Sequence, residues 1–165
     1  MVYNYTDSGL TAVGSMLDFV LQSKREHEVA GELKRILVVD DEENARIALS
    51  KILAREGYDV ASAGNGYEAL DYLRGREVEL IITDINMPEM NGMAFLRELN
   101  RSHPASNVIM ITAYGEVESY IEAMNLGAFE YINKPVKLEE LNRIINKIFN
   151  QNSDAQPREA HHETV

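Results

Sequence analysis

Apolar runs of strand length alternate with segments of helical periodicity through the middle of the chain. Most of the runs are rich in Val and Ile and end at polar or turn residues, which predicts buried strands. The predicted strands are residues 35–39, 59–63, 78–83, 108–111 and 129–132. Between and after them, apolar residues recur every three or four positions, which predicts helices that face a core. The predicted helices include residues 45–53, 67–74, 93–100, 116–125 and 138–150.

This strand–helix alternation, with short connections, predicts an α/β fold. Parallel strands joined by right-handed helical crossovers form a doubly wound sheet with helices on both faces. For a unit of this kind, the expected arrangement is a flavodoxin-like (βα)5 sheet with strand order 2-1-3-4-5.

The predicted fold covers residues 34–150 and leaves a segment at each end. Residues 1–33 read as an N-terminal helical extension whose apolar stripe must bury against something. Packing on the domain itself and pairing with a partner or a second copy stay open. Residues 151–165 lack periodicity and read as a disordered tail or the start of a linker. The stripe consists of Leu10, Val13, Met16, Leu17, Val20 and Leu21.

Composition narrows the classes of function. A net charge of −11 argues against direct binding of nucleic acid by this chain. The absence of cysteine rules out disulfides and thiol chemistry. No apolar run reaches the roughly 18 residues of a membrane span, and no secretory signal is visible. We therefore expect a soluble, cytoplasmic protein that makes no membrane contact.

Polar side chains gather where the predicted strands end. Asp40 and Asp41 follow the first strand, Asp84 the third, Thr112 the fourth and Lys134 the fifth. In the expected strand order these four strands are neighbours, so their carboxyl ends bring the side chains into one crevice. Crowded carboxylates repel one another, and a hard divalent cation such as Mg²⁺ relieves that repulsion.

Two kinds of role are open for these carboxylates. Asp40 and Asp41 could simply cap the helix that follows, although capping alone would not require two adjacent Asp and a third at another strand. Asp84 is a candidate nucleophile, because a carboxylate can attack a phosphoryl group and form an aspartyl phosphate. Thr112 and Lys134 would then supply the hydroxyl and ammonium that the incoming charge needs.

Residues of about 34 to 150 resemble the receiver domain of two-component response regulators. The resemblance rests on Ile-Leu-Val-Val-Asp-Asp-Glu at 36–42, Asp-Ile-Asn-Met-Pro-Glu-Met-Asn-Gly at 84–92, Ile-Thr-Ala at 111–113 and Tyr-Ile-Asn-Lys-Pro at 131–135. In that order the four motifs are highly specific. The resemblance implies a Mg²⁺-dependent signalling switch that accepts a phosphoryl group from a histidine kinase or a phosphotransfer protein.

The resemblance also implies a role for each site residue. Asp84 is the phosphoacceptor, and Asp40, Asp41, Asp84 and the backbone carbonyl of Asn86 hold Mg²⁺. Phosphoryl oxygens are bound by two further side chains, Thr112 and Lys134.

Signal output involves a further part of the family pattern. Tyr131 matches the switch aromatic, which turns inward as Thr112 moves. The read-out surface would be residues 116–125, 129–132 and 138–150. It is a candidate surface for a homodimer, as is the N-terminal helix. The bond between Lys134 and Pro135 is typically cis in this family. We further expect Asn86 and Tyr114 to flank the hydrolytic water and so to tune the phosphorylated lifetime.

Competing functions remain to be separated. Metal-dependent phosphohydrolases that use an Asp nucleophile carry a general acid two residues later, and Asn86 cannot fill that role. A receiver that switches without phosphate is not favoured, because every site residue is present. We expect no enzyme activity beyond self-phosphorylation and dephosphorylation. Three interpretations of the chain stay open: a single-domain regulator, a phosphorelay carrier, or a fragment of a longer transcriptional regulator. The downstream target is unknown.

Overall fold

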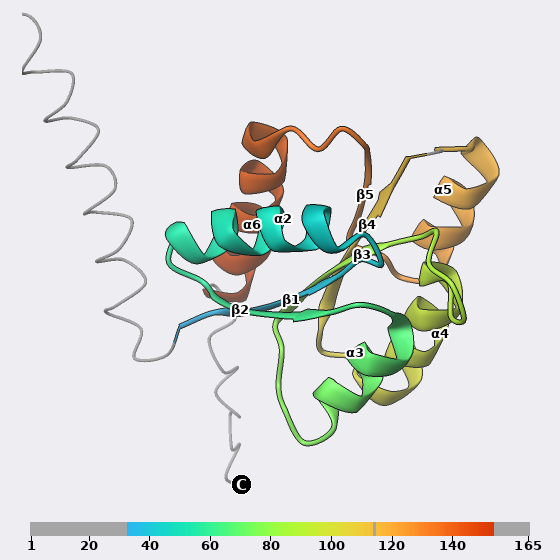
Figure 1. The fold of residues 1–165 in the computed structure, drawn as a ribbon, viewed down its shortest axis with the longest axis horizontal. Coiled ribbons are helices and arrows are strands. Elements are labelled where there is room, and N and C mark those ends of the chain that lie inside the picture. The colour runs from blue at the N-terminus through green and yellow to red at the C-terminus, as the bar shows by residue number, and fades with distance from the viewer. Residues whose placement is uncertain (1–32, 114, 154–165) are drawn as a thin grey trace, which may run out of the picture.

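The computed structural model describes residues 33–113 and 115–153 as a parallel sheet with helices on both faces (Figure 1). The five strands are β1 (Arg35–Val39), β2 (Asp59–Ala63), β3 (Leu80–Asp84), β4 (Asn107–Thr112) and β5 (Glu130–Asn133). They pair in the order β2-β1-β3-β4-β5, and every pairing is parallel. The predicted α/β fold and its strand order are therefore confirmed.

Five helices connect and follow the strands within the described residues. They are α2 (Glu43–Arg55), α3 (Gly66–Leu73), α4 (Gly92–Ser102), α5 (Val117–Asn125) and α6 (Leu138–Ser153). The last helix continues past the predicted end at residue 150. The predicted N-terminal helix and most of the predicted tail, residues 1–32 and 154–165, lie outside the described residues.

Strand β3 is shifted toward its carboxyl end relative to the prediction. It begins at Leu80 rather than Val78, and Asp84 is its last residue. Asp84 belongs to the strand because it pairs with Ile111 of β4 in the parallel ladder. The backbone of Asp84 is thus fixed by the sheet.

Each face of the sheet supports its own hydrophobic core. Leu37, Ile81 and Met110 point to a core covered by α3, α4 and α5. Ile36 and Ile82 point to the opposite core, which α2 and α6 cover. Figure 1 shows the same division, with α2 and α6 on one side of the sheet and the other three helices on the other. Strands that are apolar on both faces, as predicted, are what this two-sided burial requires.

Helix α4 begins against the end of β3 because Gly92 has no side chain. A Cβ built on Gly92 would lie 2.3 Å from the carbonyl oxygen of Asp84 and 2.8 Å from the Cα of Ile85. The Gly92 amide donates to the Ile85 carbonyl at 2.8 Å, and Asn91 caps the helix through Ala94 N at 2.9 Å. The turn after Asp84 is therefore compact and closely packed on the strand.

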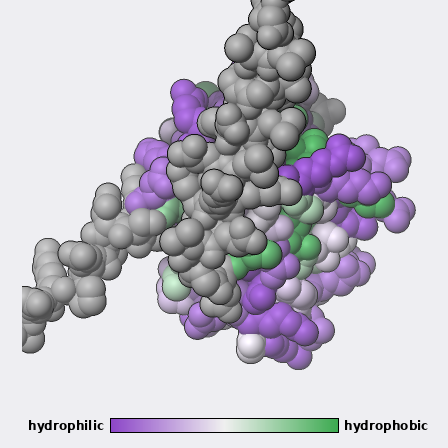
Figure 2. All heavy atoms as spheres, turned by 90° about the vertical axis from the view of Figure 1, so that its left-hand side faces the viewer, coloured by the Kyte–Doolittle hydropathy of each residue, from purple (hydrophilic) through white to green (hydrophobic). Residues whose placement is uncertain are grey.

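Hydrophilic residues make up most of the described surface that is visible in Figure 2, with hydrophobic residues in small patches. None of the helices in the described part of the chain is both long enough and apolar enough to cross a bilayer.

Candidate functional site at the carboxyl edge of the sheet

Four strand ends bring the predicted site residues together. Asp40 directly follows β1, Asp84 and Thr112 are the last residues of β3 and β4, and Lys134 directly follows β5. Because β1, β3, β4 and β5 are neighbours in the sheet, these residues converge at one edge. The Lys134 amide also donates to the Thr112 carbonyl at 2.7 Å, which fixes Lys134 to the end of β4.

Three carboxylates form a cluster that suits a hard cation. Asp40, Asp41 and Asp84 each offer an oxygen, and these oxygens all lie within 4.8 Å of one another. Asp40 and Asp84 are buried, at 8% and 7% exposure, whereas Asp41 is exposed. An all-oxygen set with one side open to water fits Mg²⁺, which keeps several water ligands.

Lys134 bridges the two buried carboxylates. Its Nζ hydrogen-bonds Asp84 Oδ2 and lies 3.1 Å from Asp40 Oδ2. Burial by itself lowers the pKa of Lys134, but the hydrogen bonds and charges of Asp84 and Asp40 outweigh it and raise this pKa. Lys134 is therefore a charged ammonium at neutral pH. The Lys134–Pro135 peptide bond is cis, as the family resemblance implies.

Asp40 does not cap the helix that follows it. The N-cap of α2 is Glu42, which makes no side-chain capping bond. Asp40 Oδ1 instead accepts the Glu42 amide at 2.8 Å, within the loop before the helix. The capping interpretation of Asp40 and Asp41 is wrong, because the helix begins too late in the chain for either residue to occupy its N-cap.

Asn86 links Asp84 to Thr112. The Asn86 amide donates to Asp84 Oδ1 at 2.9 Å, and its side-chain Nδ2 lies 3.3 Å from Thr112 Oγ1. Asn86 is exposed, whereas Thr112 is fully buried at 0% exposure. The backbone carbonyl of Asn86 as a metal ligand stays a prediction.

Tyr131 lies on β5 beside α5 and not at the acidic cluster. It is half-buried, its hydroxyl is 2.8 Å from Ser119 Oγ, and its ring meets the ring of Tyr120 edge-on at 5.6 Å. In the ladder it pairs with Met110, two residues before Thr112. Tyr114, the other residue predicted near this loop, lies outside the described residues.

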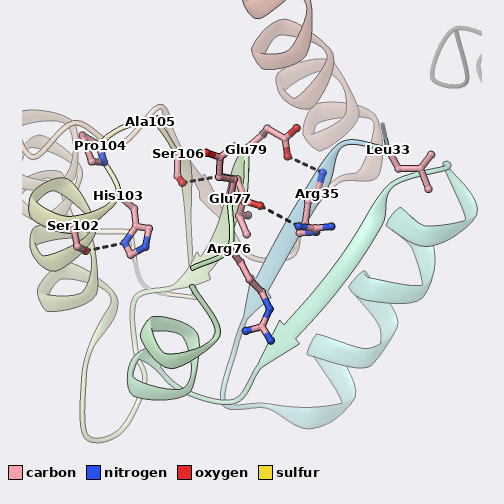
Figure 3. Close-up of a pocket in the computed structure, with 11 residues that line it drawn as sticks. Leu33, Arg35, Arg76, Glu77, Glu79, Ser102, His103, Pro104, Ala105 and Ser106 are labelled. Carbon is pink, nitrogen blue, oxygen red and sulfur yellow. Dashed lines mark hydrogen bonds between the residues drawn. The ribbon is translucent and has the colours of Figure 1, made fainter. Parts of the chain in front are cut away.

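A cavity of about 400 Å³ lies at the opposite, amino-terminal end of the strands (Figure 3). Several of its polar groups have partners in the protein. Arg35 Nε binds Asp59 Oδ2 at 2.7 Å, and Ser106 Oγ donates to the Val78 carbonyl at 2.6 Å. Among the described residues, the acidic cluster that could hold a metal ion lies at the carboxyl edge and not in this cavity.

Two contacts around the site were missed by sequence reasoning. Arg46 Nη1 on α2 donates to the Asp40 carbonyl at 2.6 Å, and Ser119 on α5 meets Tyr131. A cation and a hydroxyl on exposed helices carry no sequence signal of such roles, because most residues of this kind face solvent.

A comparison with known sequences identifies a family. The sequence model of the response regulator receiver domain family matches residues 36–146, a range that includes the whole carboxylate cluster. The regulatory protein AtoC of Escherichia coli strain K12 is 42% identical over 115 residues, which are 70% of this chain and 25% of AtoC. The chain thus spans about a quarter of the length of this curated relative.

Solved structures share the fold. Response regulator protein TrrA from Thermotoga maritima, in complex with Mg²⁺-BeF, has a TM-score of 0.64 and 36% identity over 70% of this chain and 99% of TrrA. The beryllofluoride-activated NtrC4 receiver domain dimer has a TM-score of 0.68 and 35% identity over 72% of this chain and 98% of that chain.

Proposed function

Since this chain belongs to the family of response regulator receiver domains, we propose that its phosphorylation switch operates through Asp84 as the phosphoacceptor. The observation that carries the proposal is the position of Asp84. It is buried at the end of β3, between a lysine ammonium and a backbone amide. Both contacts are made by donors to the carboxylate oxygens of Asp84, and a carboxylate oxygen is the atom that would attack phosphorus.

Asp40, Asp41 and Asp84 would hold Mg²⁺, with the Asn86 carbonyl as a further ligand. The mutual approach of the three carboxylates within 4.8 Å supports this assignment, and the related TrrA was crystallised with Mg²⁺-BeF. When bound, the ion neutralises charge on the transferring phosphoryl group.

The transfer itself is a displacement at phosphorus. A carboxylate oxygen of Asp84 forms a bond to phosphorus, the bond from phosphorus to the histidine nitrogen of the donor breaks, and that nitrogen keeps the electron pair. Lys134 would bind a phosphoryl oxygen, and the contact of its ammonium with Asp84 Oδ2 supports this role. Thr112 would donate its hydroxyl to another oxygen once it moves away from Asn86.

Output would follow from the shift of Thr112. Space vacated behind Thr112 lets Tyr131 leave its position beside Ser119 and turn inward, which alters the surface formed by α5, β5 and α6. This surface is the proposed homodimer contact, as the existence of an NtrC4 receiver dimer supports. The N-terminal segment is the alternative contact.

The remaining proposals concern partners and lifetime. The donor would be a histidine kinase or phosphotransfer protein of the cytoplasm. The target is a protein or an output domain, as in a longer regulator such as AtoC. The chain would catalyse only its own phosphorylation and dephosphorylation. Asn86 and Tyr114 would flank the hydrolytic water and set the rate of dephosphorylation, which is measurable in Tyr114→Ala.

Acetyl phosphate with Mg²⁺ tests the proposed function. The wild type should gain one phosphoryl group in intact-mass measurement, and Asp84→Asn should gain none. Asp71→Asn is the matched control, because Asp71 is an exposed carboxylate on α3 paired with Arg74. Labelling that persists in Asp84→Asn, or wild type that is never labelled, would overturn the assignment. Multiple turnovers of a small phosphate ester would favour a hydrolase instead.

A further inference from the structure

Arg46 hydrogen-bonds the main chain of Asp40, a proposed metal ligand, and not its carboxylate. It lies in the first half of α2, is half-buried, and donates from Nη1 to the Asp40 carbonyl at 2.6 Å. A charged donor at this distance makes one of the stronger kinds of hydrogen bond. Arg46 therefore ties the loop between β1 and α2 to the helix.

The two oxygens of the Asp40 carboxylate have different partners, and a bound metal ion would compete with only one of these partners. Oδ1 accepts the Glu42 amide at 2.8 Å, a contact within the same loop. Oδ2 contacts Lys134 Nζ at 3.1 Å, and a cation bound at the cluster competes with this ammonium. The bond from Arg46 involves the main-chain oxygen and leaves both carboxylate oxygens unaffected.

The main chain of Asp40 is held from two sides. Its amide donates to the Ala63 carbonyl of β2 at 3.3 Å, while its carbonyl accepts from Arg46. Asp41 follows directly and is exposed, so its position depends on how firmly the preceding peptide is held. A loop that is ordered before the cation arrives loses less conformational entropy on binding.

We propose that Arg46 is a positioning residue for the cation site, which holds the Asp40–Asp41 peptide so that both carboxylates face the ion. The inference rests on the proposed function, because it assumes that Mg²⁺ binds at this cluster. Residues outside the coordination shell that orient ligands commonly contribute 10- to 100-fold to metal affinity.

The sign of the effect separates positioning from simple electrostatics. The guanidinium is a positive charge close to a cation site, so its removal should by Coulomb's law tighten Mg²⁺ binding. If Arg46 acts by holding the loop, its removal should instead weaken binding. The two explanations therefore predict opposite changes for a neutral replacement.

The test uses Arg46→Met, which keeps the apolar stem but loses both the charge and the donor. Isothermal titration of the full chain with MgCl2 should show a dissociation constant about tenfold higher than that of the wild type. Arg55→Ala is the matched control, because it removes the same charge from the exposed last turn of the same helix. Its dissociation constant should stay within about twofold of the wild-type value.

Unfolding in urea with EDTA measures the stability of each variant without the ion. If Arg46→Met does not fold, Arg46→Lys takes its place and should also bind Mg²⁺ more weakly, because a compact ammonium lacks the planar, extended guanidinium that reaches the carbonyl. A folded variant of either kind that binds Mg²⁺ as tightly as the wild type, or more tightly, overturns the inference alone. Wild type that binds no Mg²⁺ overturns the proposed magnesium site and this inference with it.

Discussion

The hydroxyl of Tyr131 on β5 donates a hydrogen bond to Ser119 Oγ on α5, 2.8 Å away. The direction follows from the single hydrogen of the serine hydroxyl. Ser119 Oγ also lies 2.8 Å from the Glu116 carbonyl, which can only accept. The serine hydrogen is used there, so the tyrosine must be the donor. This bond connects the proposed switch residue to the first turn of α5.

Removing either partner of the Tyr131–Ser119 bond should destabilise the protein. Tyr131→Phe and Ser119→Ala should each lower the free energy of unfolding by about 0.5–1.5 kcal/mol, measured in urea. The double variant should lose less than the sum of the two, since each single change already removes the Tyr131–Ser119 bond, although Ser119→Ala also removes the bond to the Glu116 carbonyl. Tyr67→Phe, at an exposed site on α3, is the control and should change little. Strict additivity would contradict the link.

Removing the ammonium of Lys134 should destabilise the domain in EDTA. Lys134→Met leaves the buried Asp40 and Asp84 uncompensated, and we expect a loss of about 1–3 kcal/mol in unfolding free energy. The pKa of Lys134 is raised in the folded protein above its unfolded value of 10.5, so protonated Lys134 stabilises the fold. This stabilisation is fully present below pH 10.5, which includes neutral pH, and is lost as the pH rises through the folded pKa.

Magnesium should then stabilise Lys134→Met more than the wild type, because the ion no longer competes with the ammonium for Asp84 and Asp40. Urea unfolding with and without saturating Mg²⁺ measures both effects. Lys137→Met, an exposed lysine three residues later, serves as the control. An equal gain from Mg²⁺ in both proteins would refute the competition.

A methyl group at Gly92 should disturb the loop that follows Asp84. The added Cβ would meet main-chain atoms of Asp84 and Ile85 at 2.3 and 2.8 Å, and these cannot move without shifting the strand end. We expect Gly92→Ala to lower the unfolding free energy by about 1–3 kcal/mol. Phosphorylation by acetyl phosphate should also slow.

Gly64→Ala provides the comparison for Gly92→Ala. Its Cβ would lie 3.3 Å from Glu68 Oε2, the end of a flexible side chain. We expect a change of no more than about 0.5 kcal/mol. Similar losses at the two glycines would show that the close approach at Gly92 has no special role.

Stability at alkaline pH should depend on Tyr58. It is buried at 8% exposure and its ring lies 5.5 Å from that of Phe149. Burial, with a smaller effect of the Glu56 charge, raises the pKa of Tyr58 from 10.0 to about 12. The folded protein thus holds this proton more tightly than the unfolded chain. The resulting stability is fully present below pH 10 and is lost as pH rises toward 12.

The measurement compares wild type with Tyr58→Phe by urea unfolding across about pH 9 to 12. The wild type should lose about 1–3 kcal/mol more than the variant over this range. Other ionisable groups are the same in both proteins, so the difference isolates Tyr58. Parallel pH profiles would mean that Tyr58 titrates normally in the fold.

The alternation of apolar runs and amphipathic segments was enough to predict the strand order and both faces of burial. Neighbouring residues such as Leu37 and Val38 point to opposite faces of a strand, so both can be buried only if helices cover both sides of the sheet, which is what a parallel sheet with helical crossovers provides. The same reasoning placed Asp40, Asp84, Thr112 and Lys134 at one edge, because parallel strands end on the same side. Where a strand or helix began was less well determined, as β3 and α6 illustrate.

Contacts between side chains of different elements depended on the tertiary structure. The sequence placed a lysine near three carboxylates, but only the fold assigned it to Asp84 and Asp40 and left Asp41 exposed. Arg46 and Ser119 acquired partners through the approach of a helix to a loop and to a strand. Periodicity along a chain reports which face of an element is buried, whereas a hydrogen bond depends on distances of a few tenths of an ångström between elements, which packing alone sets.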